Sequence, residues 1–119
     1  MVRRGPGELE GEVLTALWSA PAPMTAAEVQ AALGGDLAQT TVMTILARLI
    51  GKALVVRSRE EGSRIYRYAP SVDRAEHAAE QMLSFLSSAE DHRAILARFL
   101  GRLGAADRRT AADLLRRSP

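Results

Sequence analysis

One amphipathic segment, residues 39–52, constrains the fold of this chain more than any other stretch. Its apolar residues recur at i, i+3, i+4 and i+7 and therefore share one face of a helix. They are Val42, Ile45, Leu46 and Leu49. The opposite face carries Thr40, Thr44 and Ala47, with Arg48 and Lys52 at its flank. One side must be buried, and the other suits the major groove of DNA, where threonine contacts base edges and cations hold phosphates.

Two shorter helices are predicted before this segment. The first spans residues 8–19, and the prolines at positions 21 and 23 end it. The second begins at Thr25, which has the spacing of a capping box with Glu28, and it runs to Leu33. The residues predicted to face inward are Leu9, Val13, Leu17 and Trp18 in the first helix, and Val29, Ala32 and Leu33 in the second.

Beyond residue 52 the hydrophobic period changes from 3.6 to two. Residues 55–59 and 64–68 are predicted strands, and the Glu-Glu-Gly-Ser stretch between them indicates a hairpin. Tyr66 and Tyr68 share one face of the second strand. Three helices followed by a hairpin form a winged helix-turn-helix, in which residues 39–52 are the recognition helix and the hairpin is the wing.

The remainder of the chain has no strand pattern and predicts helices at 72–88, 91–103 and 105–116. It has more apolar side chains than so short a segment can enclose, because small domains bury little of their surface. A second copy of the chain is the simplest cover, since two-fold dimers are the commonest oligomers. Packing on the winged domain is the alternative. The residues predicted to form the dimer interface are Met82, Leu83, Phe85, Leu86, Ile95, Leu96, Phe99, Leu100, Leu103, Leu114 and Leu115.

The predicted fold is therefore mainly α, with two parts. Residues 1–70 form an N-terminal winged helix-turn-helix domain of three helices plus a β-hairpin wing, and residues 71–119 form a C-terminal helical dimerisation region. The composition, 47% hydrophobic and 25% charged, is that of an ordinary folded protein. No apolar run approaches the roughly 20 residues that span a bilayer. The first seven residues lack the apolar core of a secretory signal, and cysteine is absent. We expect a cytoplasmic protein that does not contact a membrane.

Positive charge is concentrated in one region. The chain has a net charge of only +2, but six cationic side chains against two carboxylates give residues 37–70 a net charge of +4. This cationic stretch coincides with the predicted recognition helix and wing. It is consistent with a phosphate-binding surface, and equally with an ordinary solvated surface rich in arginine.

No pattern in the sequence is typical of an enzyme or of a metal site. The chain lacks a Gly-rich phosphate loop and a His-Glu-x-x-His motif, and it has no cysteine. His77 and His92 have carboxylates nearby, but a metal would need further ligands from elsewhere in the fold. We expect a protein that is not an enzyme and that has no catalytic residue, no metal and no cofactor. A metal-responsive sensor that uses the two histidines is a separate hypothesis for the function.

Three stretches share their order and spacing with a known family. They are Glu8-Leu9-Glu10 with Val13-Leu14 and Leu17-Trp18; Thr40-Thr41-Val42-Met43-Thr44 with Leu46 and Arg48-Leu49; and Tyr66-Arg67-Tyr68-Ala69-Pro70. In these the chain resembles the penicillinase-repressor family of bacterial transcription regulators, the BlaI/MecI type, over residues 8–70 and more loosely beyond. The resemblance implies a dimeric winged-helix repressor that binds inverted repeats through Thr40, Thr41 and Thr44 and dimerises through its C-terminal helices. The thiolate copper sensing of one branch is excluded, because cysteine is absent.

We predict a transcriptional repressor that binds double-stranded DNA as a homodimer. The alternative is a winged-helix module that binds another protein, since fold does not fix function. Candidates for base contact are Gln39, Thr40, Thr41, Met43 and Thr44, and candidates for phosphate contact are Arg48, Lys52, Arg57, Arg59 and Arg64. For two of these residues a purely structural role is the alternative to base contact. Gln39 could serve only as the first residue of the helix, and Met43 could pack at the edge of the core. Glu60 and Glu61 at the wing tip would repel DNA if they pointed at it, so either the wing binds through the arginines of its strands or its tip is angled away from the DNA.

Overall fold

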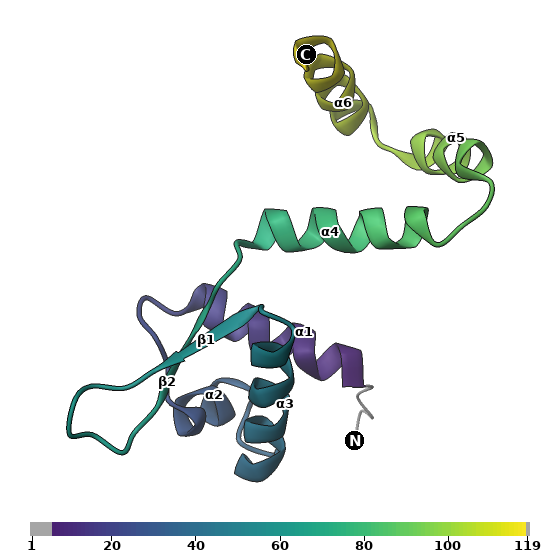
Figure 1. Ribbon diagram of the computed structural model, residues 1–119. Helices are drawn as coiled ribbons and strands as arrows, with labels where there is room; N and C mark the ends of the chain where they lie inside the picture. The colour runs from purple at the N-terminus through teal and green to yellow at the C-terminus, as the bar shows by residue number, and fades with distance from the viewer. Residues whose placement is uncertain (1–5, 119) are drawn as a thin grey trace. The chain divides into compact units, whose positions relative to one another are not determined.

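The computed structural model describes residues 6–118 and consists of helices and one antiparallel hairpin (Figure 1). The elements are α1 (Pro6–Ser19), α2 (Ala26–Ala32), α3 (Gln39–Gly51), β1 (Val55–Ser58), β2 (Arg67–Pro70), α4 (Arg74–Ser87), α5 (His92–Arg102) and α6 (Ala105–Arg117). This order confirms the predicted mainly α fold with a wing after the third helix. Residues 1–5, part of the segment in which we expect no secretory signal, lie outside the described residues.

The chain divides into two compact units, residues 1–77 and residues 78–119. The division falls inside α4, later in the chain than the predicted boundary after residue 70.

The first unit has one hydrophobic core, to which all three helices and both strands contribute. Its buried members are Val13, Leu14, Leu17, Ala26, Val29, Val42, Ile45, Leu46, Leu49, Val55 and Tyr68. The predicted inner face of α3 is confirmed, because its four apolar residues are 0–3% exposed. Ala32 is exposed, contrary to the prediction. The inward stripe of α2 is formed by Ala26, Val29 and Leu33 at i, i+3 and i+7, which turns Ala32 away from the core.

The start of α2 is fixed by the capping box that the sequence predicts. The Thr25 hydroxyl accepts a hydrogen bond from the backbone N–H of Glu28, and a Glu28 carboxylate oxygen accepts one from the backbone N–H of Thr25, at 3.1 and 2.8 Å. The pKa of the Glu28 carboxyl is lowered mainly by the hydrogen bond from the Thr25 backbone N–H, and next by the one with the Thr25 side chain. The nearby Arg67 lowers this pKa further. Two N–H groups at the helix start are thereby satisfied.

The second strand of the wing lies later than predicted. β2 comprises residues 67–70 and not 64–68, and it pairs with β1 so that Arg57 is opposite Tyr68. Tyr68 accounts for the shift, because its side chain is buried in the core and its backbone exchanges two hydrogen bonds with Met24, at 2.9 and 2.7 Å. Residues 59–66 remain outside the ladder, and in Figure 1 the loop they form extends beyond the three helices.

Trp18 joins α1 to the chain that leads into α4. Its indole N–H donates a hydrogen bond to the carbonyl oxygen of Val72 at 2.8 Å. The guanidinium carbon of Arg74 lies 5.4 Å from the indole ring centre, and the His77 ring centre lies 5.7 Å from it. The first turn of α4 therefore belongs to the winged unit.

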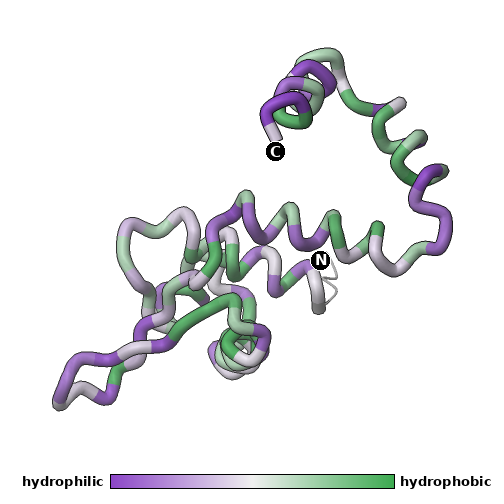
Figure 2. Tube along the Cα trace, turned by 45° about the horizontal axis from the view of Figure 1, so that its top comes forward, coloured by the Kyte–Doolittle hydropathy of each residue, from purple (hydrophilic) through white to green (hydrophobic). Residues whose placement is uncertain are grey.

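The second unit is built differently, because none of its residues from 78 to 118 is buried. Hydrophobic and hydrophilic positions alternate along α4 (Figure 2). The end of α5 is satisfied locally, because the Arg108 guanidinium donates to the carbonyl oxygens of Leu100 and Gly101 at 3.2 and 3.1 Å. The last carbonyl groups of α5 thus have hydrogen-bond partners. The apolar faces of α4, α5 and α6 nevertheless stay uncovered. Within residues 6–118 no helix is both long and apolar enough to cross a membrane.

Candidate nucleic-acid interface

The outer face of α3 is the centre of the candidate site. Thr40, Thr44 and Ala47 point opposite to the buried stripe and are exposed, as the helical period predicts. Their side chains are short, so this face offers a smooth ridge that can approach a base pair closely. The ridge is held firmly, because the other side of the same helix is fully buried in the core.

The hydroxyl of Thr44 is already oriented by its own helix. It donates a hydrogen bond to the carbonyl oxygen of Thr40 at 2.9 Å. The hydroxyl oxygen can still accept a hydrogen bond, and the methyl group stays outward. Thr44 can therefore accept from the amino group of adenine or cytosine or contact the methyl group of thymine, but it cannot donate without breaking its bond to Thr40.

The remaining base-contact candidates border this ridge at the start of α3. Gln39 is the first residue of the helix, Thr41 is exposed, and the Met43 side chain is 48% exposed. Ala38 precedes them as the N-cap and offers no side-chain oxygen, so no side chain caps the N–H groups of the first turn. Such a helix start attracts anions, including phosphate groups.

The two cations predicted on α3 differ in their surroundings. Arg48 is exposed in the last turn. The Lys52 ammonium instead contacts both carboxylate oxygens of Glu10 on α1, at 2.9 and 3.0 Å. This ion pair offsets the charge of Lys52 and draws its side chain towards α1. Of the two, Arg48 is the better placed to meet a phosphate.

The arginines of the wing fall into three groups. Arg57 and Arg59 both approach the ring of Tyr66, with guanidinium carbons 4.0 and 5.3 Å from its centre. Arg64 is exposed in the loop. Arg67 points back to α2, where it lies 3.5 Å from the Glu28 carboxylate. The contact of Arg57 and Arg59 with Tyr66 is not among the predictions, although two arginines two residues apart and an aromatic residue on the facing arm of the hairpin could have indicated it.

The acidic tip of the wing bends through a glycine. Glu60 and Glu61 are exposed, and Gly62 follows them with a φ of 82°, a conformation that glycine adopts without strain. The backbone N–H of Ser63 closes this turn on the carbonyl oxygen of Glu60 at 3.0 Å. The two carboxylates thus occupy the turn itself, beyond the end of β1 and directly after Arg59.

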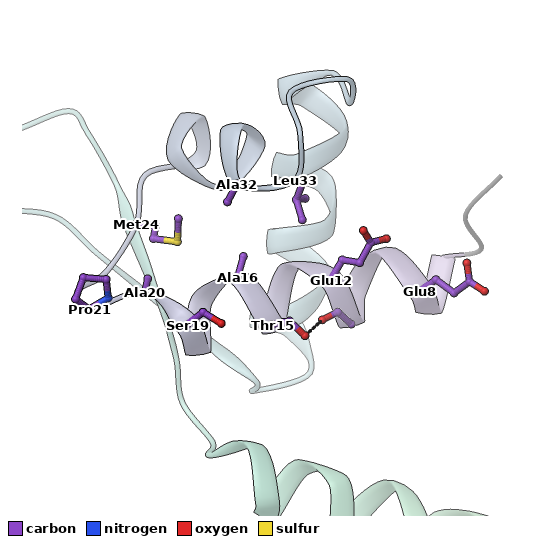
Figure 3. A pocket seen from close by; sticks show the side chains of 11 residues that line it. Glu8, Glu12, Thr15, Ala16, Ser19, Ala20, Pro21, Met24, Ala32 and Leu33 are labelled. Carbon is purple, nitrogen blue, oxygen red and sulfur yellow. Dashed lines mark hydrogen bonds between the residues drawn. The ribbon is translucent and has the colours of Figure 1, made fainter. Parts of the chain in front are cut away.

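A groove beside α1 and α2 has a different character (Figure 3). Its floor consists of small or apolar residues such as Ala16, Met24 and Leu33, and Glu8 and Glu12 lie at one end of it. Carboxylates at this position are unfavourable for a polyanion. The candidate DNA surface is the outer face of α3 together with the wing.

The predicted dimerisation residues are exposed or half-buried on α4–α6. Most of those on α4 and α5 line a hollow of about 470 Å³, formed by Ala79, Met82, Leu83, Phe85, Leu86, Ile95, Leu96 and Phe99. Such a concentration of exposed apolar side chains is typical of a surface that is covered in the assembled protein.

The two histidines do not come together with acidic residues in a ligand set. His77 packs against Trp18, and His92 is the first residue of α5. Among residues 6–118 the structure contains no group of three or more histidine, aspartate or glutamate side chains placed to hold a metal ion.

Comparison with known proteins is consistent with this geometry. The model of a family described as the penicillinase repressor matches residues 6–117. Two proteins described as transcriptional regulator BlaI, from the CDC 1551 / Oshkosh and H37Rv strains of Mycobacterium tuberculosis, are each 44% identical over 117 residues, covering 94% of this chain and 80% of theirs.

Solved structures support the fold. BpsR of Bordetella bronchiseptica, whose DNA binding is regulated by 6-hydroxynicotinic acid, matches with a TM-score of 0.51 at 23% identity, covering 91% of this chain and 75% of that one. The YusO protein of Bacillus subtilis matches with a TM-score of 0.51 at 20% identity, over 90% of this chain and 70% of its own. At these identities the likeness concerns the fold alone.

Proposed function

This chain belongs to the penicillinase repressor family of transcriptional regulators, which are not enzymes, and we propose that it represses transcription as a homodimer bound to an inverted-repeat operator. The resemblance indicated by three sequence stretches is confirmed, and the family match extends to residue 117. The chain is thus a DNA-binding repressor. We propose three further points: which residues contact DNA, that the chain forms a homodimer, and that its operator is an inverted repeat.

The observation that carries the proposal is the contrast between the two faces of α3. Val42, Leu46 and Leu49 are fully buried, whereas Thr40 and Thr44 are exposed on the opposite side. A helix held in this way can enter a major groove without disturbing the core. We expect Gln39, Thr40, Thr41, Met43 and Thr44 to face base edges.

Phosphate contacts are expected on both sides of this helix. Arg48 lies on α3, and Arg57, Arg59 and Arg64 lie in the wing. They fix the position of the protein on the duplex and carry no sequence information. Lys52 belongs to the same predicted set, but its ion pair with Glu10 must open or be shared before it binds a phosphate.

The uncovered helices of the second unit support a homodimer. A two-fold axis through α4–α6 would pair identical apolar faces and present two copies of α3 to one duplex. The two half-sites would then lie about 10 base pairs apart, or at a larger spacing that the dimer sets. Repression follows when the bound dimer blocks access of the polymerase to the promoter.

A salt titration separates this function from binding of a protein partner by the same surface. Binding to a duplex from the region upstream of the protein's own gene should weaken steeply as salt rises, because cations that contact phosphates release counterions from DNA. A flat salt response, or no binding at low salt, would contradict DNA binding through this surface.

Two substitutions test the assigned roles in the same assay. Arg48→Ala should weaken binding to all duplexes and reduce the log–log salt slope by about one. Thr44→Ala should instead relax the preference at one base position by up to about 1 kcal/mol, because a single hydroxyl or methyl contact is weaker than a bidentate pair. Thr15→Ala is the matched control, since Thr15 on α1 makes the same hydrogen bond to the carbonyl four residues before it, at 2.8 Å. Parental behaviour of the Arg48 and Thr44 variants would refute the placement of α3.

A further inference from the structure

The wing contains an aromatic side chain that holds two cations. Tyr66 is the last residue before β2, and its ring is half-buried against the hydrophobic core. Arg57 in β1 and Arg59 just after it place their guanidinium groups over this ring, with carbons 4.0 and 5.3 Å from its centre. The ring is fixed by the core, so it can restrict two otherwise exposed side chains.

The stacking leaves the hydrogen-bonding edges of both guanidinium groups available. A cation–π contact uses the flat face of the guanidinium, whereas its N–H donors point outward in the plane. Arg67 and Lys52 are engaged with carboxylates in this part of the chain, at 3.5 and 2.9 Å. Among residues 6–118, no carboxylate lies within ion-pair distance of Arg57 or Arg59.

Two cations gathered on one ring also repel each other. Their repulsion is relieved when an anion binds between them, and the planar fork of donors on each side chain suits a phosphate oxygen. Tyr66 therefore lowers the conformational cost of ordering the arginines at the moment of binding and concentrates positive charge at one point of the wing.

We infer that Tyr66 is a positioning residue for DNA binding, which holds Arg57 and Arg59 as a preformed pair for one stretch of the phosphate backbone. This inference rests on the proposed function, because the ligand is a duplex. Tyr66 itself does not contact DNA. Its contribution should be independent of sequence and should be seen with an operator fragment and with a random-sequence duplex alike.

A double-mutant cycle tests the inference on the full chain. With both arginines present, Tyr66→Leu should weaken binding of a random-sequence duplex at low salt by about 3- to 10-fold, because the pair is no longer ordered. In the Arg57→Ala/Arg59→Ala background the same substitution should have less than about a twofold effect. Tyr66→Phe keeps the aromatic face and should retain parental affinity.

Arg64→Ala provides the matched control. Arg64 is an exposed arginine of the same loop, but no contact with the Tyr66 ring holds it. The effects of Tyr66→Leu and Arg64→Ala should therefore add, whereas those of Tyr66→Leu and Arg57→Ala should not. An equal loss from Tyr66→Leu in every background, or no loss while the melting temperature is unchanged, would overturn the inference.

A spectroscopic measurement decides the case even where Tyr66→Leu fails to fold. In the free parental protein, the ring current of Tyr66 should shift the side-chain proton resonances of Arg57 upfield, and those of Arg59 less, as their distances imply. Resonances of both arginines at unstructured-peptide positions would overturn the inference. Failure of the parental protein to bind any duplex would overturn the proposed function and this inference together, whereas parental binding with additive variants would overturn the inference alone.

Discussion

The inward stripe of α3 in the first unit (Val42, Ile45, Leu46 and Leu49) is 0–3% exposed, whereas Phe85 on α4 and Phe99 on α5 in the second unit are 79% and 44% exposed. Both regions have amphipathic helices with comparable apolar stripes. In the first unit α1, α2 and the hairpin surround α3, but in the second unit no helix is enclosed by the other two. The period of a stripe thus tells which face of a helix will be buried, and it does not tell what will cover that face.

The difference also separates the two tasks that the proposed function requires, DNA binding and dimerisation. The first unit has a complete core of its own, so the ridge on α3 is presented in one fixed form. The second unit is incomplete as a single copy, since its apolar surface is favourable only when it is removed from water. Changes at apolar positions of the second unit should therefore act through assembly, and changes at core positions of the first unit should act through folding.

The largest effect is expected from placing a charge in the apolar hollow of the second unit. Leu83→Asp would bury an unpaired carboxylate in the proposed dimer interface, which is strongly unfavourable. We expect monomers and a loss of operator affinity of about 100-fold or more, because two linked half-sites bind far more tightly than one. Light scattering coupled to size-exclusion chromatography gives the mass, and a DNA titration gives the affinity.

Gln81→Asp is the control for this change. It introduces the same charge on the same helix, at an exposed position outside the hollow, and should leave both the dimer and the affinity intact. If the Leu83 variant remained a dimer with parental affinity, the interface would lie elsewhere and the comparison between the units would lose its explanation.

A smaller effect is expected from a cavity in the first unit. Leu46→Ala should lower the free energy of unfolding by about 2–5 kcal/mol, because the leucine is fully buried between the helices and the site cannot collapse completely. Trp18, the single tryptophan, reports on this unit by its fluorescence during urea unfolding. The loss should not depend on protein concentration.

Leu114→Ala on α6 is the contrasting variant. This side chain is 59% exposed in a single copy, so its truncation should cost less than about 1 kcal/mol in the monomer and matter only where dimers form. A concentration-independent loss as large as that of Leu46→Ala would mean that the second unit has a core of its own.

The sequence predicts most of the first unit because its signals are local and agree with one another. The stripe on α3 and the Thr25–Glu28 capping box each depend on residues within one turn or two of a helix. The second strand was misplaced because Tyr68 is drawn to Met24, which lies 44 residues earlier in the chain and is bonded to it by two backbone hydrogen bonds. Periodicity contains no information about such a distant partner.

The candidate site was predictable to a similar extent. Exposure of Thr40 and Thr44 follows from the helical period alone. The ion pair of Lys52 with Glu10 and the stacking of Arg57 on Tyr66 depend instead on how separate elements meet, so a count of cations along the chain treats all of them as equivalent. The charge pattern of the sequence therefore indicates where the candidate DNA surface lies. The contacts within the fold determine which of its cations are available to bind a phosphate.

The smallest effect concerns a helix end of the first unit. The lowered pKa of Glu28 means that its ionised form is favoured in the folded state, so its contribution to stability is complete above the ordinary value of 4.5 and is lost as the pH falls through the lowered pKa. Glu28→Gln keeps a side-chain oxygen for the Thr25 N–H but cannot be protonated and no longer attracts Arg67. The variant should therefore be slightly less stable than the parent at neutral pH, and the two stabilities should converge below pH 4.5 when unfolding is followed by Trp18 fluorescence. Glu60→Gln, which removes a carboxylate from the wing tip, corrects for the change in net charge. A difference between Glu28→Gln and the parent that persisted undiminished in acid would show that the capping carboxylate acts by its shape and not by its charge.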